Sequence, residues 1–266
     1  MVNTFVVFVL WADAVPLIMP PKVSVVKAPL GGGAPTTLVA SQTASGGIAL
    51  GPAGVYWTES ATGAVMRAPL DGGMASTLAS GPQGAGAVAV DGTSIYWECA
   101  DLGPVMRAPL AGGVTTTLAP AGDAFGFAVD ATSVYWTSRS VYPSTPGTVR
   151  RVALDGGAVT TLASLPGADP LGLAVDATNA YFTDGNSVLK APLAGGATTT
   201  LVATGHAGNL AVDATSVYWA DETDGAVTKV PLGGGSPATL FKATSRGASP
   251  STPRASTGRA RAAARS

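Results

Sequence analysis

Short apolar runs of four to six residues, separated by Gly, Asp, Asn and Pro, follow one another along most of the chain. Four kinds of run recur in a fixed order: Gly-apolar-Ala-apolar-Asp, apolar-Tyr-Trp, Val-apolar-Lys/Arg-Ala-Pro-Leu, and Thr-Thr-Leu. Runs of this length between turn-forming residues are typical of β-strands. The Gly pairs that follow the leucines can supply the positive φ that tight hairpins require. The pattern therefore predicts units of four short antiparallel strands.

The unit repeats at a nearly constant period. The leucines that close the copies of Ala-Pro-Leu, with spacings of 40, 40, 44, 39 and 39 residues, are Leu30, Leu70, Leu110, Leu154, Leu193 and Leu232. Six four-stranded units of this length are the signature of a β-propeller. A β-helix would repeat at much shorter periods, and a sandwich would not repeat its sequence. The predicted fold is therefore all-β, a six-bladed β-propeller of four-stranded antiparallel blades.

The sizes of the residues within each unit fit this architecture. The middle of the innermost strand, where blades converge, is alanine in five units: Ala49, Ala89, Ala128, Ala174 and Ala211. All five Trp and five of the six Tyr lie in the apolar-Tyr-Trp runs or in degenerate copies at residues 9–11 and 180–182. Neighbouring aromatic positions indicate that both faces of a blade pack on other blades. We therefore expect Trp57, Trp97, Trp136 and Trp219 to be buried between blades.

The two ends of the chain carry no complete unit. Five clear copies of the innermost strand are present, one fewer than of the other three strands. We expect residues 2–9 to supply what remains of the first blade, as one long or bent strand, with an incomplete inner strand as the alternative. Residues 5–11 precede a signal-like Ala-Asp-Ala, but they are short for a signal peptide and too short to span a bilayer. We assign residues 1–242 to the propeller and the Arg/Ser/Ala-rich residues 243–266 to a disordered tail.

The repeat resembles that of a known family. Residues 211–235, AVDATSVYWADETDGAVTKVPLGGG, and 55–73, VYWTESATGAVMRAPLDGG, are similar to the YWTD repeats of the low-density-lipoprotein-receptor family. The resemblance covers residues 9–241 and implies a six-bladed propeller used as a protein-interaction module. The fourth position of the motif departs from the family, because only two of five units keep the aspartate: Glu59, Cys99, Ser138, Asp184 and Asp221. The ligand does not carry over, since interaction loops diverge first.

Composition and charge exclude several classes of function. The chain has one cysteine, Cys99, and one histidine, His206, which excludes a disulfide framework, a multi-cysteine zinc site and a His-rich metal site. Residues 1–242 hold 10 basic and 16 acidic residues, a net charge of −6, whereas residues 243–266 hold five Arg and no acid. A body of that sign repels phosphate backbones, so we expect no specific nucleic-acid binding. Cys99 is expected to be a half-buried small apolar residue.

The acidic residues divide between the two ends of the propeller. If the innermost strand runs down from a top face, the loops before it and between the second and third strands lie at that face. Ten acids fall there: Asp13, Glu59, Glu98, Asp101, Asp123, Asp169, Asp184, Asp221, Glu222 and Asp224. The other six acids lie at the bottom, where each unit also has a cation: Lys27, Arg67, Arg107, Arg151, Lys190 and Lys229. We expect the repeating residues to build the scaffold, and the residues that break the repeat to carry function.

Three consecutive units place a polar side chain at one position beside the top mouth of the channel. Asp123, Asp169 and His206 each stand four residues before the first apolar residue of an innermost strand. Two carboxylates and an imidazole could hold a divalent cation or act as acid and base. Hard oxygen ligands favour calcium over zinc, so Asp123 and Asp169 are the candidate metal ligands. Ordinary loop residues that accept hydrogen bonds in turns are the alternative.

Four further residues of the top loops are candidate ligand contacts. An insertion in the fourth unit, residues 137–147, contains Arg139 and Tyr142, and the tyrosine is flanked by prolines. Asp221 and Glu222 lie in the corresponding loop of the last unit. A tolerated surface insertion is the alternative explanation for the residues of the fourth unit.

These residues leave two classes of function. The first is a monomeric, non-catalytic binding module without a cofactor, which presents an acidic top face to a basic or neutral protein, peptide or carbohydrate. The second is a calcium-dependent, lactonase-like hydrolase with its site at the channel mouth. Lactonase-type enzymes set Glu, Asn and Asp around the axis, whereas the inner-strand positions here are mostly Ala and Gly. The binding module is therefore favoured, and the family resemblance favours an extracytoplasmic location, periplasmic or secreted.

Overall fold

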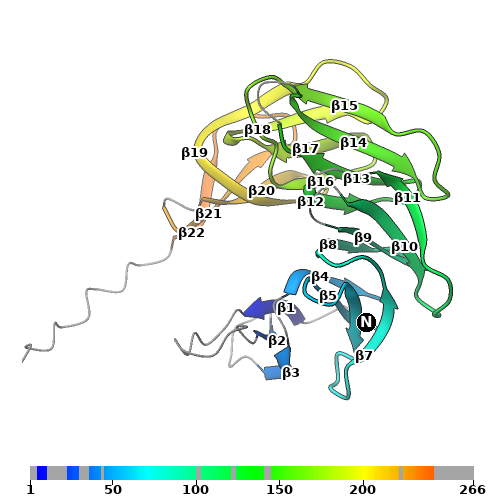
Figure 1. The fold of residues 1–266 in the computed structure, drawn as a ribbon. Coiled ribbons are helices and arrows are strands. Elements are labelled where there is room, and N and C mark those ends of the chain that lie inside the picture. Colours follow the sequence, from blue (N-terminus) through cyan, green and yellow to red (C-terminus); the bar gives the residue numbers. More distant parts are fainter. Residues whose placement is uncertain are drawn as a thin grey trace, which may run out of the picture.

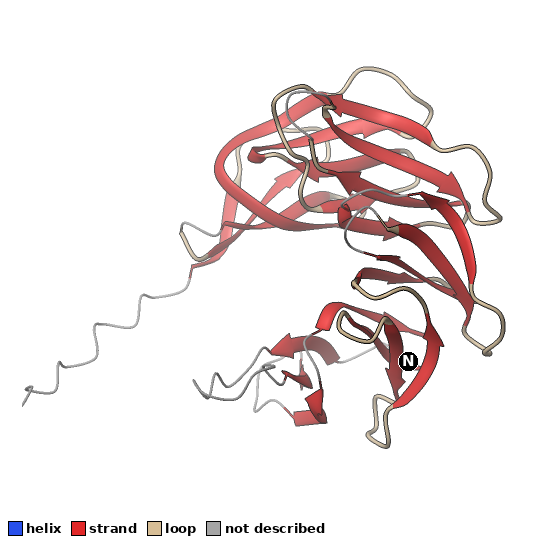
Figure 2. Cartoon of the chain, viewed as in Figure 1, coloured by secondary structure: helices blue, strands red, loops and turns tan. Residues whose placement is uncertain are grey.

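The computed structural model describes residues 5–10, 23–29, 36–42, 45–99, 103–120, 124–140, 145–221 and 224–242. Within these ranges the regular structure consists of strands without any helix (Figure 2). The described residues accordingly include no helix that could cross a membrane. The predicted all-β fold class is confirmed.

The strands form antiparallel sheets in chain order. The first sheet contains β1 (Phe5–Leu10), β2 (Val23–Pro29) and β3 (Thr36–Gln42). The second contains β4 (Ser45–Gly51), β5 (Gly54–Glu59), β6 (Ala64–Ala68) and β7 (Ser76–Ser80). The third contains β8 (Ala85–Val90), β9 (Ser94–Cys99), β10 (Pro104–Pro109) and β11 (Thr116–Pro120). The fourth contains β12 (Ala124–Val129), β13 (Ser133–Ser138), β14 (Gly147–Ala153) and β15 (Thr160–Leu165).

The last sheet has seven strands because one long strand serves two units. It contains β16 (Leu173–Val175), β17 (Asn179–Thr183), β18 (Gly185–Pro192), β19 (Thr199–Val212), β20 (Ser216–Asp221), β21 (Ala226–Pro231) and β22 (Ala238–Lys242). The first part of β19 pairs with β18 and the second part with β20. The innermost strands β4, β8, β12 and β16 lie side by side in that order, and β16 lies beside β19 (Figure 1). Each unit from the second to the fifth, together with the described strands of the last, thus has the strand order that the repeat predicts.

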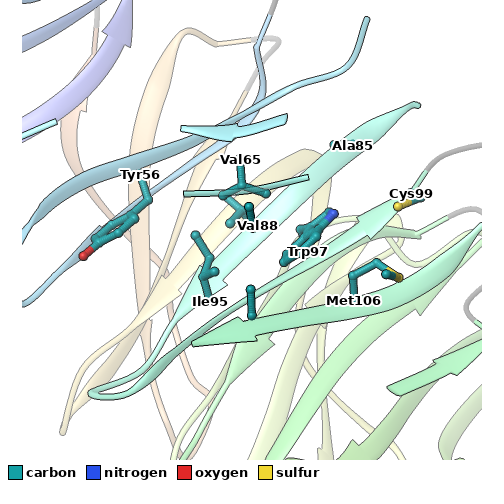
Figure 3. Packing of buried hydrophobic residues seen from close by; sticks show 10 residues of the cluster. Tyr56, Val65, Ala85, Val88, Ile95, Trp97, Cys99 and Met106 are labelled. Carbon is teal, nitrogen blue, oxygen red and sulfur yellow. The ribbon is translucent and has the colours of Figure 1, made fainter. Parts of the chain in front are cut away.

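The Tyr-Trp pairs hold neighbouring units together from both sides. Tyr56 from β5 and Trp97 from β9 belong to one buried cluster between the second and third sheets (Figure 3). Tyr96 and Trp136 meet in the same way between the third and fourth sheets. In each pair the tyrosine contacts the following unit and the tryptophan the preceding one, since adjacent residues of a strand point to opposite faces. The predicted burial is confirmed, because no more than 2% of the side chain is exposed in Trp57, Trp97, Trp136 or Trp219.

The innermost strands approach one another so closely that glycine is favoured near the beginning of each strand. A Cβ atom on Gly46 of β4 would lie 2.5 Å from the carbonyl oxygen of Ala85 in β8. A Cβ atom on Gly172, just before β16, would lie 2.8 Å from the carbonyl oxygen of Gly208. Contacts this short force neighbouring atoms apart in a close-packed interior. The small residues predicted for the innermost strand therefore reflect packing of backbone on backbone.

The first sheet differs from the prediction in register. In the second to the sixth unit, the repeating cation lies opposite the tyrosine that occupies the first aromatic position. In the first sheet the corresponding cation, Lys27, lies opposite Val7, so Val7 and Phe8 hold the Tyr-Trp positions. The copy expected at residues 9–11 is therefore wrong, because Val7 and Phe8 lack the Tyr-Trp sequence that marks these positions in the other units. Within the described residues the first sheet has no innermost strand, as in the incomplete arrangement.

The last sheet leaves one apolar face uncovered among the described residues. Leu240 and Phe241 of β22 are 53% and 62% exposed. Leu201, which corresponds to Leu240 in the preceding unit, is only 9% exposed because the next unit packs on it. The first and last sheets lie at the two ends of an open arc (Figure 1). A closed ring of six blades therefore remains a prediction, and the tail at 243–266 lies outside the described residues.

Candidate functional site

The aspartates that follow the innermost strands are structural. In the fourth sheet, Oδ1 of Asp130 accepts hydrogen bonds from the backbone amides of Thr132 and Ser133 at 2.7 and 2.8 Å. The hydroxyl of Tyr135 donates to Oδ2 at 2.7 Å. The same bonds form around Asp91, Asp176 and Asp213. The predicted role in capping turns is confirmed.

These contacts shift the pKa of both partners. Burial alone would raise the pKa of Asp130, but the hydrogen bonds from Tyr135, Thr132 and Ser133 outweigh it and hold the pKa below its ordinary value. Burial, together with the bonded carboxylate, raises the pKa of Tyr96 and of Tyr181 to about 12. The ionised aspartate and the neutral tyrosine therefore stabilise each other.

The second sheet has the tyrosine without the aspartate. In the second sheet Gly51 stands where the other units have the aspartate. The buried hydroxyl of Tyr56 consequently has no hydrogen-bond partner among the described residues. A buried hydroxyl without a partner costs free energy of folding.

The repeating cations bridge neighbouring units. Four of them donate to the carbonyl oxygen of a leucine in the next unit: Lys27 to Leu70 at 2.6 Å, Arg67 to Leu110 at 3.4 Å, Arg107 to Leu154 at 3.1 Å and Lys190 to Leu232 at 3.1 Å. Arg151 makes no such bond within the described part of the chain, and Lys229 lies over the ring of Tyr218, 6.0 Å from its centre. The cations therefore serve the scaffold through carbonyl groups.

A second contact joins the innermost strands at their top ends. The hydroxyl of Thr58 accepts a bond from the amide of Gly47 at 2.9 Å and donates to the carbonyl oxygen of Gly86 in the next unit at 2.6 Å. Thr137 and Thr183 make the same two bonds. We call this arrangement the threonine clamp. In the third sheet the position is occupied by Glu98, which is 4% exposed. Its assignment to the acidic top surface is therefore wrong, because the position faces the packed interior.

Residues that break the repeat gather at the top end of the fourth sheet. Phe125 of β12 occupies a position that is glycine in three other units, and its side chain is 40% exposed. The guanidinium of Arg139 lies 3.9 Å from the centre of the Phe125 ring, a cation–π contact. Ser140 donates from its hydroxyl and its amide to Oδ1 of Asp169 at 2.6 and 2.7 Å. We call these four residues the top platform.

The top platform carries an ionised carboxylate. The two bonds from Ser140 lower the pKa of Asp169, and the charge of Arg139 adds to them, although partial burial opposes the shift. The contact also confirms that the loop before an innermost strand and the loop between the second and third strands lie at the same end. The structure thus brings Asp169 and Arg139 together at this end, and their role in binding a ligand stays a prediction.

The other predicted site residues lie in the last sheet or outside the described residues. His206 is an exposed residue of β19 and precedes Ala207, which pairs with Asp221 of β20. The residues outside the described ranges are Asp123, Tyr142 and Glu222. Within the described ranges no group of three His, Cys, Asp or Glu side chains could hold a metal ion. Calcium binding by Asp123 and Asp169 therefore stays a prediction.

Sequence reasoning missed Phe125 and Ser140. Phe125 lies within an apolar strand and therefore does not stand out by its polarity. It could have been identified because it replaces a glycine of the repeat. Ser140 meets Asp169 across 29 residues of sequence, a contact that no local pattern reveals. The top face is also less acidic than expected, because Glu98 is buried and Asp224 pairs with Lys242 at 3.2 Å.

Cys99 is more buried than expected, at 1% exposure. Burial raises the pKa of its thiol to about 11, so the group stays protonated at neutral pH. This agrees with a packing residue and gives no support to a nucleophile.

A hollow of about 580 Å³ lies at the bottom end, between the fourth and last sheets. Its walls include Asp130, Arg151 and Asp176. Both carboxylates are committed to turns and tyrosines, as described above, which leaves Arg151 as the charged group with unused donors in this part of the described structure. The hollow therefore has fewer charged groups free to bind a ligand than the top platform has.

Comparison with known proteins shows the fold. No family model and no curated protein matches the sequence. A chain of the nidogen–laminin complex is similar in structure, with a TM-score of 0.67 and 18% identity over 86% of this chain and 89% of that one. A gluconolactonase from Xanthomonas campestris has a TM-score of 0.57 and 19% identity over 74% and 75% of the two chains. The calcium-binding protein regucalcin from Agrobacterium tumefaciens has a TM-score of 0.55 and 18% identity over 73% of each. The chain therefore has the fold of a β-propeller.

Proposed function

We propose that this propeller is a non-catalytic binding module that holds a protein, peptide or carbohydrate ligand on the top platform. The observation that carries the proposal is the guanidinium of Arg139, 3.9 Å above the exposed ring of Phe125 and close enough to Asp169 to lower its pKa. The aromatic ring offers a flat apolar contact, and the two charged groups offer directional hydrogen bonds. A chain of similar fold occurs in a complex of nidogen with laminin, which agrees with a binding role.

The charge of the top loops favours a basic or neutral ligand. Asp169, Asp221 and Glu222 belong to these loops, and a negative rim raises the local concentration of cationic partners. Tyr142 belongs to the same insertion as Arg139 and is a further candidate contact. We also propose that the protein is a monomer. Its proposed location outside the cytoplasm follows from the family resemblance.

Arrays of peptides and of glycans, probed with the labelled full chain, test the proposal. We expect binding to at least one class of spot, and a loss of at least tenfold in the Phe125→Ala/Arg139→Ala double variant. Arg151→Ala is the matched control, because it removes a cation from the same unit at the bottom end. Absence of binding by the wild type, or equal binding by the double variant, would contradict the proposal.

A calcium-dependent, lactonase-like hydrolase is the alternative. It is favoured by the ionised carboxylate of Asp169 at the top end, on a fold shared with a gluconolactonase and with regucalcin. Calorimetric titration with calcium would compare the wild type with Asp123→Ala/Asp169→Ala and with His206→Ala, alongside hydrolysis of gluconolactone. Calcium binding that is lost in the double variant, together with lactone hydrolysis, would support the hydrolase. Equal binding by all three, or none, would leave the binding module.

A further inference from the structure

Three other units have the threonine of the clamp at one position of their second strand. In the third sheet Glu98 occupies this position. Its Oε1 accepts a hydrogen bond from the amide of Ala87 at 3.2 Å. This is the same bond that Thr58, Thr137 and Thr183 accept from the corresponding amides of their own innermost strands. One half of the clamp is therefore conserved in the third unit, with a carboxyl oxygen in place of a hydroxyl oxygen.

The carboxyl group fills the joint between two innermost strands. In the second sheet, a Cβ atom on Gly46 would meet the backbone of the next innermost strand, at 2.6 Å from the Cα of Gly86. In the third sheet, a Cβ atom on the corresponding residue, Gly86, would instead overlap the carboxyl group of Glu98. The carboxyl group thus takes the space between β8 and β12 that backbone atoms fill elsewhere.

The other half of the clamp requires a donor. In each of the three units the threonine donates to the carbonyl oxygen of the same position in or just before the next innermost strand, which is Gly86, Leu171 or Gly208. The register of the sheets makes Phe125 the residue at that position in β12. A carbonyl oxygen only accepts, and an ionised carboxylate cannot donate. A protonated carboxyl group supplies one acceptor and one donor, as the threonine hydroxyl does.

The surroundings of Glu98 also favour the proton. Among the described residues, those shown beside it are uncharged: Gly86 and Ala87 on β8, and Val105 on β10. The titratable neighbour on its own strand is the Cys99 thiol, and burial, the largest cause of its raised pKa, favours its neutral form. The positive charge of Arg139, which lies over the exposed ring of Phe125, instead favours the ionised form of Glu98. Burial of Glu98 to 4% exposure penalises its ionised form.

We propose that Glu98 is a protonated carboxyl group that clamps β8 to β12 by donating to the carbonyl oxygen of Phe125. Loss of the proton replaces this bond with two facing acceptors and loosens the strand that carries Phe125. The clamp therefore makes ligand binding on the top platform sensitive to pH, a consequence that rests on the proposed function. The protonation state of Glu98 does not rest on it.

The chain contains only three glutamates, Glu59, Glu98 and Glu222, so their carboxyl carbons can be followed individually. Protein labelled with ¹³C at the glutamate carboxyl groups should give three signals in NMR, assigned with Glu59→Gln, Glu98→Gln and Glu222→Gln. The reference value is the ordinary pKa of a glutamate, about 4.3. The Glu98 signal should stay that of a protonated carboxyl group to at least one pH unit higher. Titration of Glu98 together with the other two, or below them, would overturn the proposal.

Thermal unfolding gives a second readout. A carboxyl group that keeps its proton in the folded state stabilises at low pH, and this stabilisation is lost as pH rises through its titration. The melting temperature of the wild type should therefore fall between pH 5 and 8 relative to that of Glu98→Gln, which keeps a donor, and of Glu98→Thr, which restores the clamp. Parallel curves would contradict the clamp. Ligand binding that does not follow the Glu98 titration would remove only the link to the top platform.

Discussion

Aspartate and tyrosine side chains form the same hydrogen-bonded pair in four units, at 2.7 Å in each. The pair closes the turn after the innermost strand and satisfies a phenol that would otherwise be buried without a partner. Tyr56 is the natural exception, since its unit has Gly51 in place of the aspartate. The two environments allow the contribution of the pair to be measured within one protein.

Tyr135→Phe should lower the free energy of unfolding by about 1–3 kcal/mol, because it removes a hydrogen bond to a charged carboxylate. Tyr56→Phe should change it by less than about 0.5 kcal/mol or increase it, because the hydroxyl lost there is buried without a partner in the described structure. Urea denaturation of both variants measures the difference. Equal losses would show that the hydroxyl of Tyr56 is bonded in solution.

The same pairs predict how stability depends on pH. The aspartates have a pKa below the ordinary value, so their contribution is complete above about pH 4 and is lost as pH falls through the folded-state pKa. Tyr96 and Tyr181 have a pKa of about 12, so their contribution is complete below about pH 10 and is lost as pH rises toward 12. Thermal unfolding from pH 2 to 12 should show both declines. A melting temperature that rises below pH 4 would be inconsistent with these pairs.

At the scale of the elements, neighbouring units are joined edge to edge by their innermost strands and face to face by the Tyr-Trp pairs. The innermost strands leave room for little more than backbone, and the threonine clamp spans three of the joints with a single hydroxyl each. Phe125 and Glu98 have larger side chains than the glycine or threonine at these positions in other units. Both lie at the joint between β8 and β12. The position of the top platform is therefore set by packing between two specific strands.

Gly126→Ala should destabilise the fold by roughly 1–3 kcal/mol, because a Cβ atom there would meet the carbonyl oxygen of Leu171 and lie 2.6 Å from the Cβ of Leu173. Gly205→Ala in β19 is the matched control, since its Cβ atom would meet nothing within 4 Å. The control should stay within about 0.5 kcal/mol of the wild type. Chemical denaturation compares them, and equal effects would mean that the innermost strands are not in close contact.

The period of the repeat was sufficient to predict the strands, their order and the burial of the tryptophans, because every unit repeats the same packing. The repeat did not predict the register of β1. Val7 and Phe8 replace the Tyr-Trp pair there, so the sequence of β1 is an apolar run that does not mark which residue pairs with Lys27. For the site, the repeat placed Asp169 and Arg139 at one end. It could not reveal Ser140 or the inward direction of Glu98, because both depend on contacts between units.

At the scale of the whole molecule, the described units form an arc, and the last sheet exposes an apolar face that the preceding unit buries. A repeat protein usually protects its terminal unit with polar residues, and β22 has Leu240 and Phe241 instead. The exposure of these side chains provides a direct test of whether the ends meet in solution.

Leu201→Ala should lower the free energy of unfolding by about 2–5 kcal/mol, because this leucine is buried under the next unit. Leu240→Ala should cost less than about 1 kcal/mol, because 53% of its side chain is exposed. Denaturant titration measures both. A large loss in Leu240→Ala would show that the last face is covered, as in a closed ring.

We propose that ligand binds at the top end, on residues that break the repeat. Backbone amide NMR of the full chain, titrated with the peptide or glycan selected on the arrays, locates the binding surface. We expect the shifts to concentrate at Gly126, Ser140 and Asp169, with Thr132 and Thr178 of the bottom turns unchanged. Shifts concentrated around Thr132, Arg151 and Thr178 would instead place the ligand in the bottom hollow and contradict the claim.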